Sequence, residues 1–391
     1  MQSRTVTTVL LGVAQTLAWA SSYYLPAILA GVIGQSVGAS SSTMFGAFSV
    51  ALLISAAIGP FAGRLIDRRG GRPVLMTSNL VFSVGLAALS QAQQPLHVFA
   101  AWAVLGLAMG SGLYEAAFST VVRLYGQQAR RAITGITLFA GFASTVGWPL
   151  TAWLENSLGW RGACLVWAAL HLLIGLPLNA LLPAAERTVP APQDTPGQPE
   201  PQAMLAPDRQ RSAAILMAFV FAVAWFISTA MAAHLPQLLM GAGVSLAAAV
   251  GIAALVGPAQ VAGRLIEFAF LSRMHPLLSA RLATLAHPLG VLCIGLLGNS
   301  GAIAFAVLHG LGNGILTIAI GTLPLLFFGA KGYGQRQGFL MVPARVVQAG
   351  APFLFGLAVE RLGTGALWIS AGLGVAACLA LTRMAWEMRT R

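Results

Sequence analysis

A succession of long apolar stretches is the feature that most restricts what this chain can fold into. Twelve stretches of about 20 residues follow one another, separated by short polar segments. The hydrocarbon core of a bilayer is about 30 Å thick, so each stretch is long enough to cross it as a helix. Runs such as 164–170 and 303–308 are continuously apolar, whereas a membrane β-barrel needs alternating residues. The sequence therefore predicts an all-α integral membrane protein with twelve transmembrane helices.

The composition excludes a soluble protein. Only 8% of the residues are charged and 57% are hydrophobic, whereas soluble domains are about a quarter charged. The first predicted span begins after Arg4 and ends near Ile33, which is too long for a signal peptide. The remaining spans are predicted at about 43–65, 73–92, 98–122, 132–154, 162–182, 213–239, 245–265, 278–297, 302–328, 337–359 and 364–386.

The basic residues predict the orientation in the membrane. The chain has 22 Lys and Arg against 10 Asp and Glu, for a net charge of +12. In a membrane protein such an excess holds cytoplasmic loops inside, rather than indicating nucleic-acid binding. With the N-terminus inside, every Lys and Arg falls on the inner side, Arg264 included, except Arg161 and Arg361 outside and Arg345 within a span. We therefore expect a multi-pass protein of the plasma (inner) membrane with both termini in the cytoplasm.

The chain divides into two similar halves. A segment rich in Pro and Gln predicts a cytoplasmic linker at 184–211, between an N-terminal six-helix bundle at 1–183 and a C-terminal one at 212–391. Residues 63–67 (Gly-Arg-Leu-Ile-Asp) recur as 263–267 (Gly-Arg-Leu-Ile-Glu), and two further matches follow in the same order. This repeat predicts two bundles related by a pseudo-two-fold axis.

The loop between the second and third spans carries a family resemblance. Residues 63–72 read Gly-Arg-Leu-Ile-Asp-Arg-Arg-Gly-Gly-Arg, which resembles the G-x-L-x-D-R-x-G-R-R motif of major facilitator superfamily (MFS) secondary transporters. Gly71 stands where the family usually has a basic residue, and 159–161 (Gly-Trp-Arg) also resembles a recurrent family feature. The resemblance implies a transporter that works by alternating access. It also implies that this loop latches the two halves together in the outward-facing state.

The same residues have a physical reading of their own. Gly63 permits close helix packing, and Gly70 permits a sharp turn. Asp67 is placed to face the positive N-terminal end of a neighbouring helix, while Arg68 and Arg72 hold the loop at an anionic leaflet. The alternative is a plain basic inner loop with no gating role.

Two charged residues fall inside predicted spans, where a charge costs at least ~2.5 to 3.5 kcal/mol and so indicates a functional site. Glu115 in the fourth span is a candidate proton-coupling carboxylate, or a structural acid paired with a base at the inner gate. Arg345 in the eleventh span could bind an anionic substrate, or join the halves by pairing with Asp67 or Glu115. We favour the gating role for Arg345.

Polar and aromatic residues on the first, fourth, seventh and tenth spans are candidates for lining a substrate cavity, given the resemblance. They are Gln15, Trp19, Ser22, Tyr23, Tyr114, Trp225, Ser228, His234, His309, Asn313 and Thr317. The last three are spaced at i, i+4 and i+8, so they share one helix face. The alternative is that such groups only hydrogen-bond to neighbouring helices. We expect His171 and His287 to be packing residues.

Several absences restrict the function. The three cysteines have no metal-binding or disulfide spacing, and no motif for ATP hydrolysis or a reactive nucleophile is present. The sequence therefore predicts no enzyme, cofactor or metal. Proton-coupled drug exporters of the family usually have a basic residue in the fourth span and a G-P-x-x-G-G motif in the fifth. This chain has no arginine between His97 and Arg123, and its fifth span lacks that motif.

The resulting prediction is a secondary transporter, either symporter or antiporter, of a small organic solute. We expect protons as the coupling ion and a carboxylate-bearing substrate, because Arg345 and the basic excess favour an anion. Its other partner is the lipid bilayer, with no nucleic acid, and we expect a monomer. One alternative is efflux of amphipathic or toxic compounds, and another is a non-transporting membrane sensor.

Overall fold

The computed structural model describes residues 3–184, 207–271 and 274–389, and the part described is helical without strands. The helices of the first half are α1 (Arg4–Ser21), α2 (Leu25–Val37), α3 (Ser41–Arg69), α4 (Gly71–Ser90), α5 (Pro95–Gly112), α6 (Tyr114–Tyr125), α7 (Arg130–Ala140), α8 (Ala143–Leu170) and α9 (Leu176–Ala180). A 3-10 turn (Gly126–Ala129) precedes α7, and a π-helical turn (His171–Gly175) joins α8 to α9.

The second half repeats this organisation with fewer breaks. Its helices are α10 (Pro207–Gly241), α11 (Leu246–Ala254), α12 (Val256–Ala269), α13 (Pro276–Leu297), α14 (Ala302–Phe328), α15 (Tyr333–Leu362) and α16 (Ala366–Arg389). Short 3-10 turns at Gly298–Gly301 and Gly363–Gly365 precede α14 and α16. Most of the predicted linker at 184–211 lies outside the described residues, so the boundaries at 183 and 212 stay predictions.

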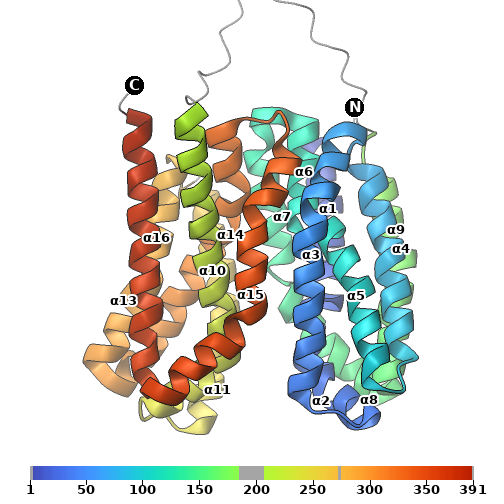
Figure 1. Cartoon of the computed structure of the whole chain (residues 1–391), viewed down its shortest axis with the longest axis horizontal. Coiled ribbons are helices and arrows are strands. Elements are labelled where there is room, and N and C mark those ends of the chain that lie inside the picture. Colours follow the sequence, from blue (N-terminus) through green and yellow to red (C-terminus); the bar gives the residue numbers. More distant parts are fainter. Residues whose placement is uncertain (1–2, 185–206, 272–273, 390–391) are drawn as a thin grey trace, which may run out of the picture.

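Together these helices form the twelve transmembrane passes predicted from the sequence, in two six-helix bundles that stand side by side (Figure 1). Some passes consist of two consecutive helices, as in α1 with α2 and α5 with α6. Within α8, Gly159 adopts a φ of 71°, a left-handed value that suits glycine, and this residue separates the fifth pass from the sixth. Each half has its own core of buried apolar side chains.

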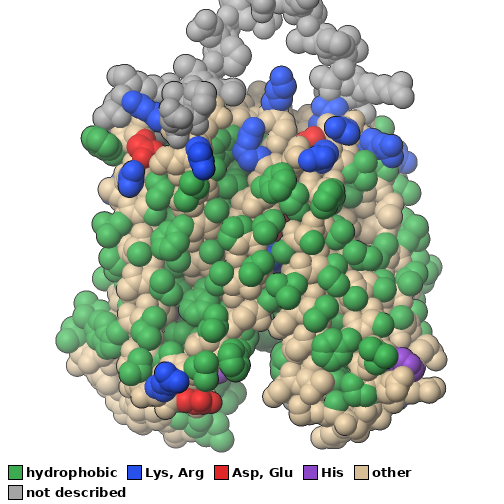
Figure 2. Space-filling model, in the orientation of Figure 1, with side chains coloured by type: hydrophobic (Ala, Val, Ile, Leu, Met, Phe, Trp, Pro, Cys, Tyr) green, Lys and Arg blue, Asp and Glu red, His purple; other side chains and the backbone are tan. Residues whose placement is uncertain are grey.

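The outer surface is apolar over most of its height, as a lipid-facing surface must be. Eight helical stretches among the described residues are long and apolar enough to cross a membrane, and five of them run through more than one helix. Arginine and lysine side chains gather at the end of the molecule where both chain termini lie (Figure 2). We call this the termini end and the opposite one the far end.

The two halves are in contact at the termini end and separate at the far end. Figure 2 shows a groove between them that opens at the far end. The most extensive contacts that join the halves are made by α3 with α15, α6 with α15, and α7 with α12 and α14. The halves are therefore joined at the termini end and separated by a groove at the far end.

Candidate functional site

Interrupted helices surround the region between the two halves. The first pass breaks at 22–24, and α2 begins at Leu25 with Pro26, which has no N–H to donate, in its first turn. The fourth pass, predicted as one helix, breaks at Leu113, whose φ and ψ are −85° and −163°. The fifth pass breaks between α7 and α8, after Ala140. Such breaks are tolerated at membrane depth only where protein or a polar cavity satisfies the backbone.

The break at Leu113 places Glu115 in the first turn of α6, where the positive end of the helix stabilises a carboxylate. Its Oε1 accepts a hydrogen bond of 2.8 Å from Nη2 of Arg345 on α15. Nη1 of Arg345 donates to Oε1 of Gln348 at 2.9 Å, and Gln348 donates to the hydroxyl of Tyr23 at 3.0 Å. Arg345 thus pairs with Glu115 rather than with Asp67, and this network joins the halves.

Aromatic rings cover the Glu115–Arg345 pair. The indole rings of Trp19 and Trp225, one from each half, stack with their centroids 6.0 Å apart and an interplanar angle of 1°. The Arg345 guanidinium lies over the Trp225 ring at 4.9 Å, within the range of a cation–π interaction. Tyr23 and Tyr114 pack against Trp19 at 5.1 and 4.7 Å. The site therefore combines a charged pair with a wall of flat, apolar rings.

Arg264 is a second buried arginine among the described residues. The sequence analysis counted it on the inner side of the membrane and did not single it out as a charge inside the bundle. Arg264 is 5% exposed, and its side chain lies against Gly141, at the α7–α8 break of the opposite half. Nε and Nη1 of Arg264 have no hydrogen-bond partner in the described structure. Arg264 therefore has two buried donor nitrogens without an acceptor.

The halves meet closely along α3 and α15 on the termini side of this site. A Cβ added to Gly63 would collide with the backbone of Gly334, and one added to Gly338 would lie 2.5 Å from Cα of Pro60. The Asp67 carboxylate accepts hydrogen bonds of 2.9 Å from the backbone N–H groups of Gly334 and Gln335, at the start of α15. Asp67 therefore caps a helix of the other half, and absent side chains let the two backbones touch.

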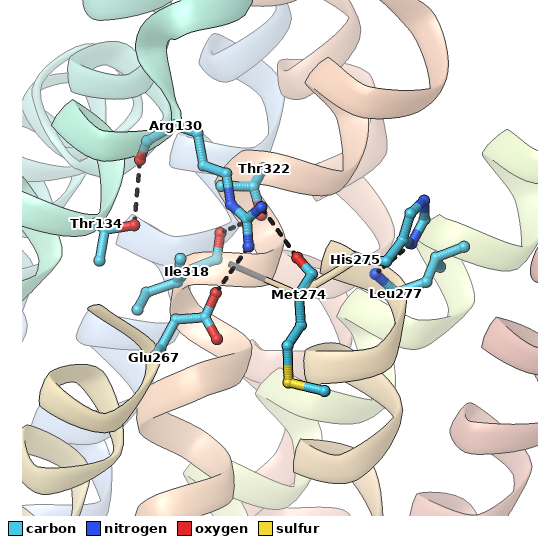
Figure 3. A network of polar contacts seen from close by, with 8 residues as sticks. All are labelled: Arg130, Thr134, Glu267, Met274, His275, Leu277, Ile318 and Thr322. Carbon is cyan, nitrogen blue, oxygen red and sulfur yellow. Dashed lines mark hydrogen bonds and ion pairs between the residues drawn. The ribbon is translucent and has the colours of Figure 1, made fainter. Parts of the chain in front are cut away.

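A second contact between the halves lies at the beginning of α7 (Figure 3). Nη2 of Arg130 donates to Oε1 of Glu267 on α12 at 3.2 Å, and its Nη1 donates to the carbonyl of Met274 at 3.3 Å. The Glu267 side chain is 4% exposed and that of Arg130 is 26% exposed. Sequence reasoning missed this pair. The signal that could have found it was the repeat, because Glu267 corresponds to Asp67.

The remaining sequence candidates fall into two groups. Some lie around the central site: Gln15 donates to the Gly112 carbonyl at the α5–α6 break, the Ser22 hydroxyl donates to the Ala18 carbonyl, and Tyr23 contacts Thr229. Others lie inside the second half: Asn313 donates to Ser228, Thr317 donates to the Asn313 carbonyl, and His234 donates to the Pro352 carbonyl.

The histidines make more specific contacts than simple packing. His309 and His287 join their Nδ1 atoms at 3.1 Å, and Nε2 of His287 lies 2.9 Å from the Ser370 hydroxyl. His171 contacts Ser21 and Asn79 at 2.7 and 2.9 Å. His309 and Asn313 share a cavity between α10, α13, α14 and α16, away from the Glu115–Arg345 pair.

The loop residues at the termini end have simple local roles. Gly70 has a φ of 83° and ends α3, which turns directly into α4. The Arg68 side chain is exposed and that of Arg72 is partly buried. Among the residues that the structure describes, no cluster of three metal-binding side chains occurs.

Comparisons with known proteins agree with this architecture. Human monocarboxylate transporter 11 is 28% identical over 75% of this chain and 64% of its own length. A gallate transporter of Pseudomonas putida is 26% identical over 66% of this chain and 63% of its own. The chain covers less than two thirds of the length of each of these relatives. The crystal structure of the proton:xylose symporter XylE superposes with a TM-score of 0.74, at 11% identity, over 97% of this chain and 96% of that one.

The sequence profile of the Major Facilitator Superfamily matches residues 11–308, which is most of the chain. The solved structure shares the fold along almost the whole length. Members of this family are transporters rather than enzymes. The chain therefore belongs to the Major Facilitator Superfamily and is a multi-pass membrane protein.

Proposed function

We propose that this protein is a proton-coupled secondary transporter that moves a small carboxylate-bearing solute by alternating access. The observation that supports it best is Arg264, a buried guanidinium that packs against Gly141 of the opposite half and has two nitrogens without a hydrogen-bond partner in the described structure. Leaving a buried charge without partners is costly, so such a group is expected to take an anionic ligand. A guanidinium also matches the geometry of a carboxylate, to which it can donate two parallel hydrogen bonds.

Two further observations agree with a carboxylate. Arg345, the other buried arginine, already has Glu115 and Gln348 as partners, which leaves Arg264 as the better anion site. Two relatives are named as monocarboxylate and gallate transporters, and both of those names describe carboxylate substrates. The aromatic wall formed by Trp19, Tyr23 and Trp225 offers an apolar surface for the rest of the solute.

The orientation is part of the proposal. We place the termini end in the cytoplasm, because the basic side chains gather there and positive charge favours the inner face. The groove at the far end then opens outward, and the Asp67 and Glu267 contacts close the cytoplasmic side. The transport cycle requires these contacts to open while the far end closes.

The experiment is a thermal-shift screen of the purified full-length protein with benzoate, lactate, glucose, alanine and tetraphenylphosphonium. We expect benzoate or lactate to stabilise the protein, and Arg264→Gln to remove that stabilisation. Arg361→Gln is the matched control, because Arg361 is an exposed arginine at the end of α15. Stabilisation by carboxylates that survives in Arg264→Gln would contradict the assigned anion site.

The same screen tests a second candidate function, efflux of amphipathic compounds. The stacked rings of Trp19 and Trp225 favour it, because flat aromatic surfaces bind lipophilic cations well. Stabilisation by tetraphenylphosphonium alone would support efflux and exclude the carboxylate assignment.

Proton coupling through Glu115 needs a separate test in liposomes. We expect Glu115→Gln to abolish uptake driven by a pH gradient while leaving counterflow exchange intact, because exchange needs no net proton movement. Glu360→Gln, which changes an exposed carboxylate of α15, serves as the control. Unchanged gradient-driven uptake in Glu115→Gln would remove Glu115 from this role.

A further inference from the structure

Glu267 is a buried carboxylate of which only one oxygen accepts a hydrogen bond. Its Oε1 accepts from Arg130, and its Oε2 has no partner within the described structure although it is buried (Figure 3). A carboxylate has about four acceptor positions, so this one is poorly satisfied as an anion. A proton on Oε2 would turn the acceptor without a partner into a neutral hydroxyl.

The charges around Glu267 do not balance. Arg264 lies three residues before Glu267, so the two side chains are neighbours on α12. With Arg130 across the interface, two buried or half-buried positive charges face one negative charge. A proton added to Glu267 would raise this excess, whereas a carboxylate bound at Arg264 would cancel it. The anion and the proton therefore favour each other's binding, and the effect must be reciprocal.

No other acidic group contributes to this balance on the helices that pack against α12, as far as the structure describes them. α7 brings Arg130 and the exposed Arg131, and α11 has no charged residue. The titratable group of α14 is His309. It lies about 20 Å along the helix from Thr322, the α14 residue beside the Arg130–Glu267 pair, at a rise of roughly 1.5 Å per residue. His275 follows α12, and its Nδ1 accepts from the backbone of Leu277.

We propose that Glu267 is a proton-binding switch of the termini-end gate, and that it is protonated when a carboxylate occupies Arg264. The structural basis is the Arg130–Glu267 pair, which joins the halves through a carboxylate with one free, buried oxygen. Protonation removes the negative charge that holds Arg130, so α7 and α12 can separate and the gate opens. The coupling to the carboxylate rests on the proposed function, whereas the pH response of the gate does not.

The direction of the pH effect follows from the chemistry. The ion pair needs ionised Glu267, so it is present at high pH and is lost as the pH falls. The Asp67 contact differs in its partners, because backbone N–H groups donate to both of its oxygens. We therefore expect acid to open the gate through Glu267.

A cysteine at Thr322 reports on the gate without any substrate. Thr322 lies on α14 beside the pair and is 5% exposed, so a cysteine there is shielded while the gate is closed (Figure 3). The measurement is the rate of maleimide modification of Thr322→Cys in nanodiscs from pH 8.0 to 5.5, with Cys164, Cys293 and Cys378 replaced by alanine. Division by the rate of an exposed Ser300→Cys removes the pH dependence of the thiol itself.

We expect the normalised rate to rise about tenfold as the pH falls. Glu267→Gln is expected to give a high rate that does not change with pH, because glutamine is always neutral. Glu267→Asp keeps a titrating carboxylate and should keep the pH response, and Asp67→Asn should keep it as well. A wild-type pH response in Glu267→Gln, or a flat response in the unmodified protein, would overturn the proposal.

Repeating the titration with benzoate tests the link to the substrate. We expect benzoate to move the pH response towards higher pH, so that the gate opens under less acidic conditions, and we expect Arg264→Gln to abolish this shift. If the response to pH persists without any shift by benzoate or lactate, the switch stands and carboxylate binding at Arg264 is wrong. Failure of the proton switch at Glu267 and failure of carboxylate binding at Arg264 would therefore give different results.

Discussion

The segments 63–67 and 263–267 occupy equivalent places in the two halves and have nearly the same sequence, yet they close the termini end by different chemistry. In the first, Gly63 touches the backbone of the opposite half and Asp67 caps α15. In the second, Gly263 packs on Leu311 of its own half, and Glu267 reaches across to a side chain, Arg130. The contact of the first segment is made mainly by tightly packed backbone, whereas that of the second is an ion pair in which one carboxylate oxygen has no partner. The first contact should therefore be insensitive to pH, and the second should respond to it.

The strongest way to break this asymmetry is to fill the glycine contact. Gly63→Val places a side chain where the Gly334 backbone now lies, so the closed gate must open. A side chain forced into packed space costs up to about 3 kcal/mol, which is roughly a hundredfold shift towards the open gate. We expect the rate of Thr322→Cys modification to rise accordingly. Gly263→Val should instead lower the melting temperature, because its clash with Leu311 lies within one half; equal gate opening by both variants would contradict the comparison.

The next effect comes from removing the partner of Glu267. Arg130→Ala leaves a buried carboxylate without its base, which costs 3–5 kcal/mol in a fully buried pair. The Arg130 side chain is 26% exposed, so we expect about 2 kcal/mol and roughly a thirtyfold faster modification of Thr322→Cys at pH 8.0. In the Glu267→Gln background the same change should have little effect. Additive effects of the two substitutions would show that they do not act through one pair.

A smaller effect is expected at the helix cap. Asp67→Ala removes the acceptor for Gly334 and Gln335, and the loss of such a cap costs about 1 kcal/mol, or roughly a fivefold shift. Asp67→Asn should retain most of the contact, because its amide oxygen still accepts. Measured relative to the parent protein, the effect of each substitution should be the same at pH 8.0 and at pH 6.0, because Glu267 still responds to pH in both variants. An effect relative to the parent that differs between the two pH values would mean that Asp67, too, senses protons.

The smallest effect should come from Arg68, which the family resemblance placed in the latch. Its side chain is exposed, and substitutions at such positions usually change stability by less than about 0.5 kcal/mol. Arg68→Gln should therefore leave the modification rate of Thr322→Cys within about twofold of the parent. An opening as large as that of Arg130→Ala would assign Arg68 a contact that its exposure does not suggest.

The twelve passes were predictable because a continuous apolar stretch of about 20 residues is a strong signal for a membrane span. The repeat at 63–67 and 263–267 predicted that the passes form two similar bundles. The helix breaks were not predictable from hydropathy, because Leu113 and Tyr24 are as compatible with a continuous span as their neighbours. Pro26 marked one break, although a proline in a span can also merely kink it.

The burial of Arg264 was not predicted from the sequence. The corresponding residue of the first half, Arg64, is exposed, so the repeat alone does not reveal which of the two arginines is buried. Burial of Arg264 depends on the contact between α12 and the α7–α8 break, which joins residues far apart in the sequence. The pairing of Arg345 with Glu115 was among the alternatives, whereas the Arg130–Glu267 pair required the arrangement of the halves.

The parallel indoles of Trp19 and Trp225 give this protein an optical reporter of its own. One ring belongs to each half, and at a centroid separation of 6.0 Å their electronic transitions should couple. Any rocking of the halves that separates or tilts the rings would weaken that coupling. Circular dichroism in the indole bands could therefore follow the transport cycle of the unlabelled protein, with Trp225→Phe marking the spectrum of the uncoupled rings.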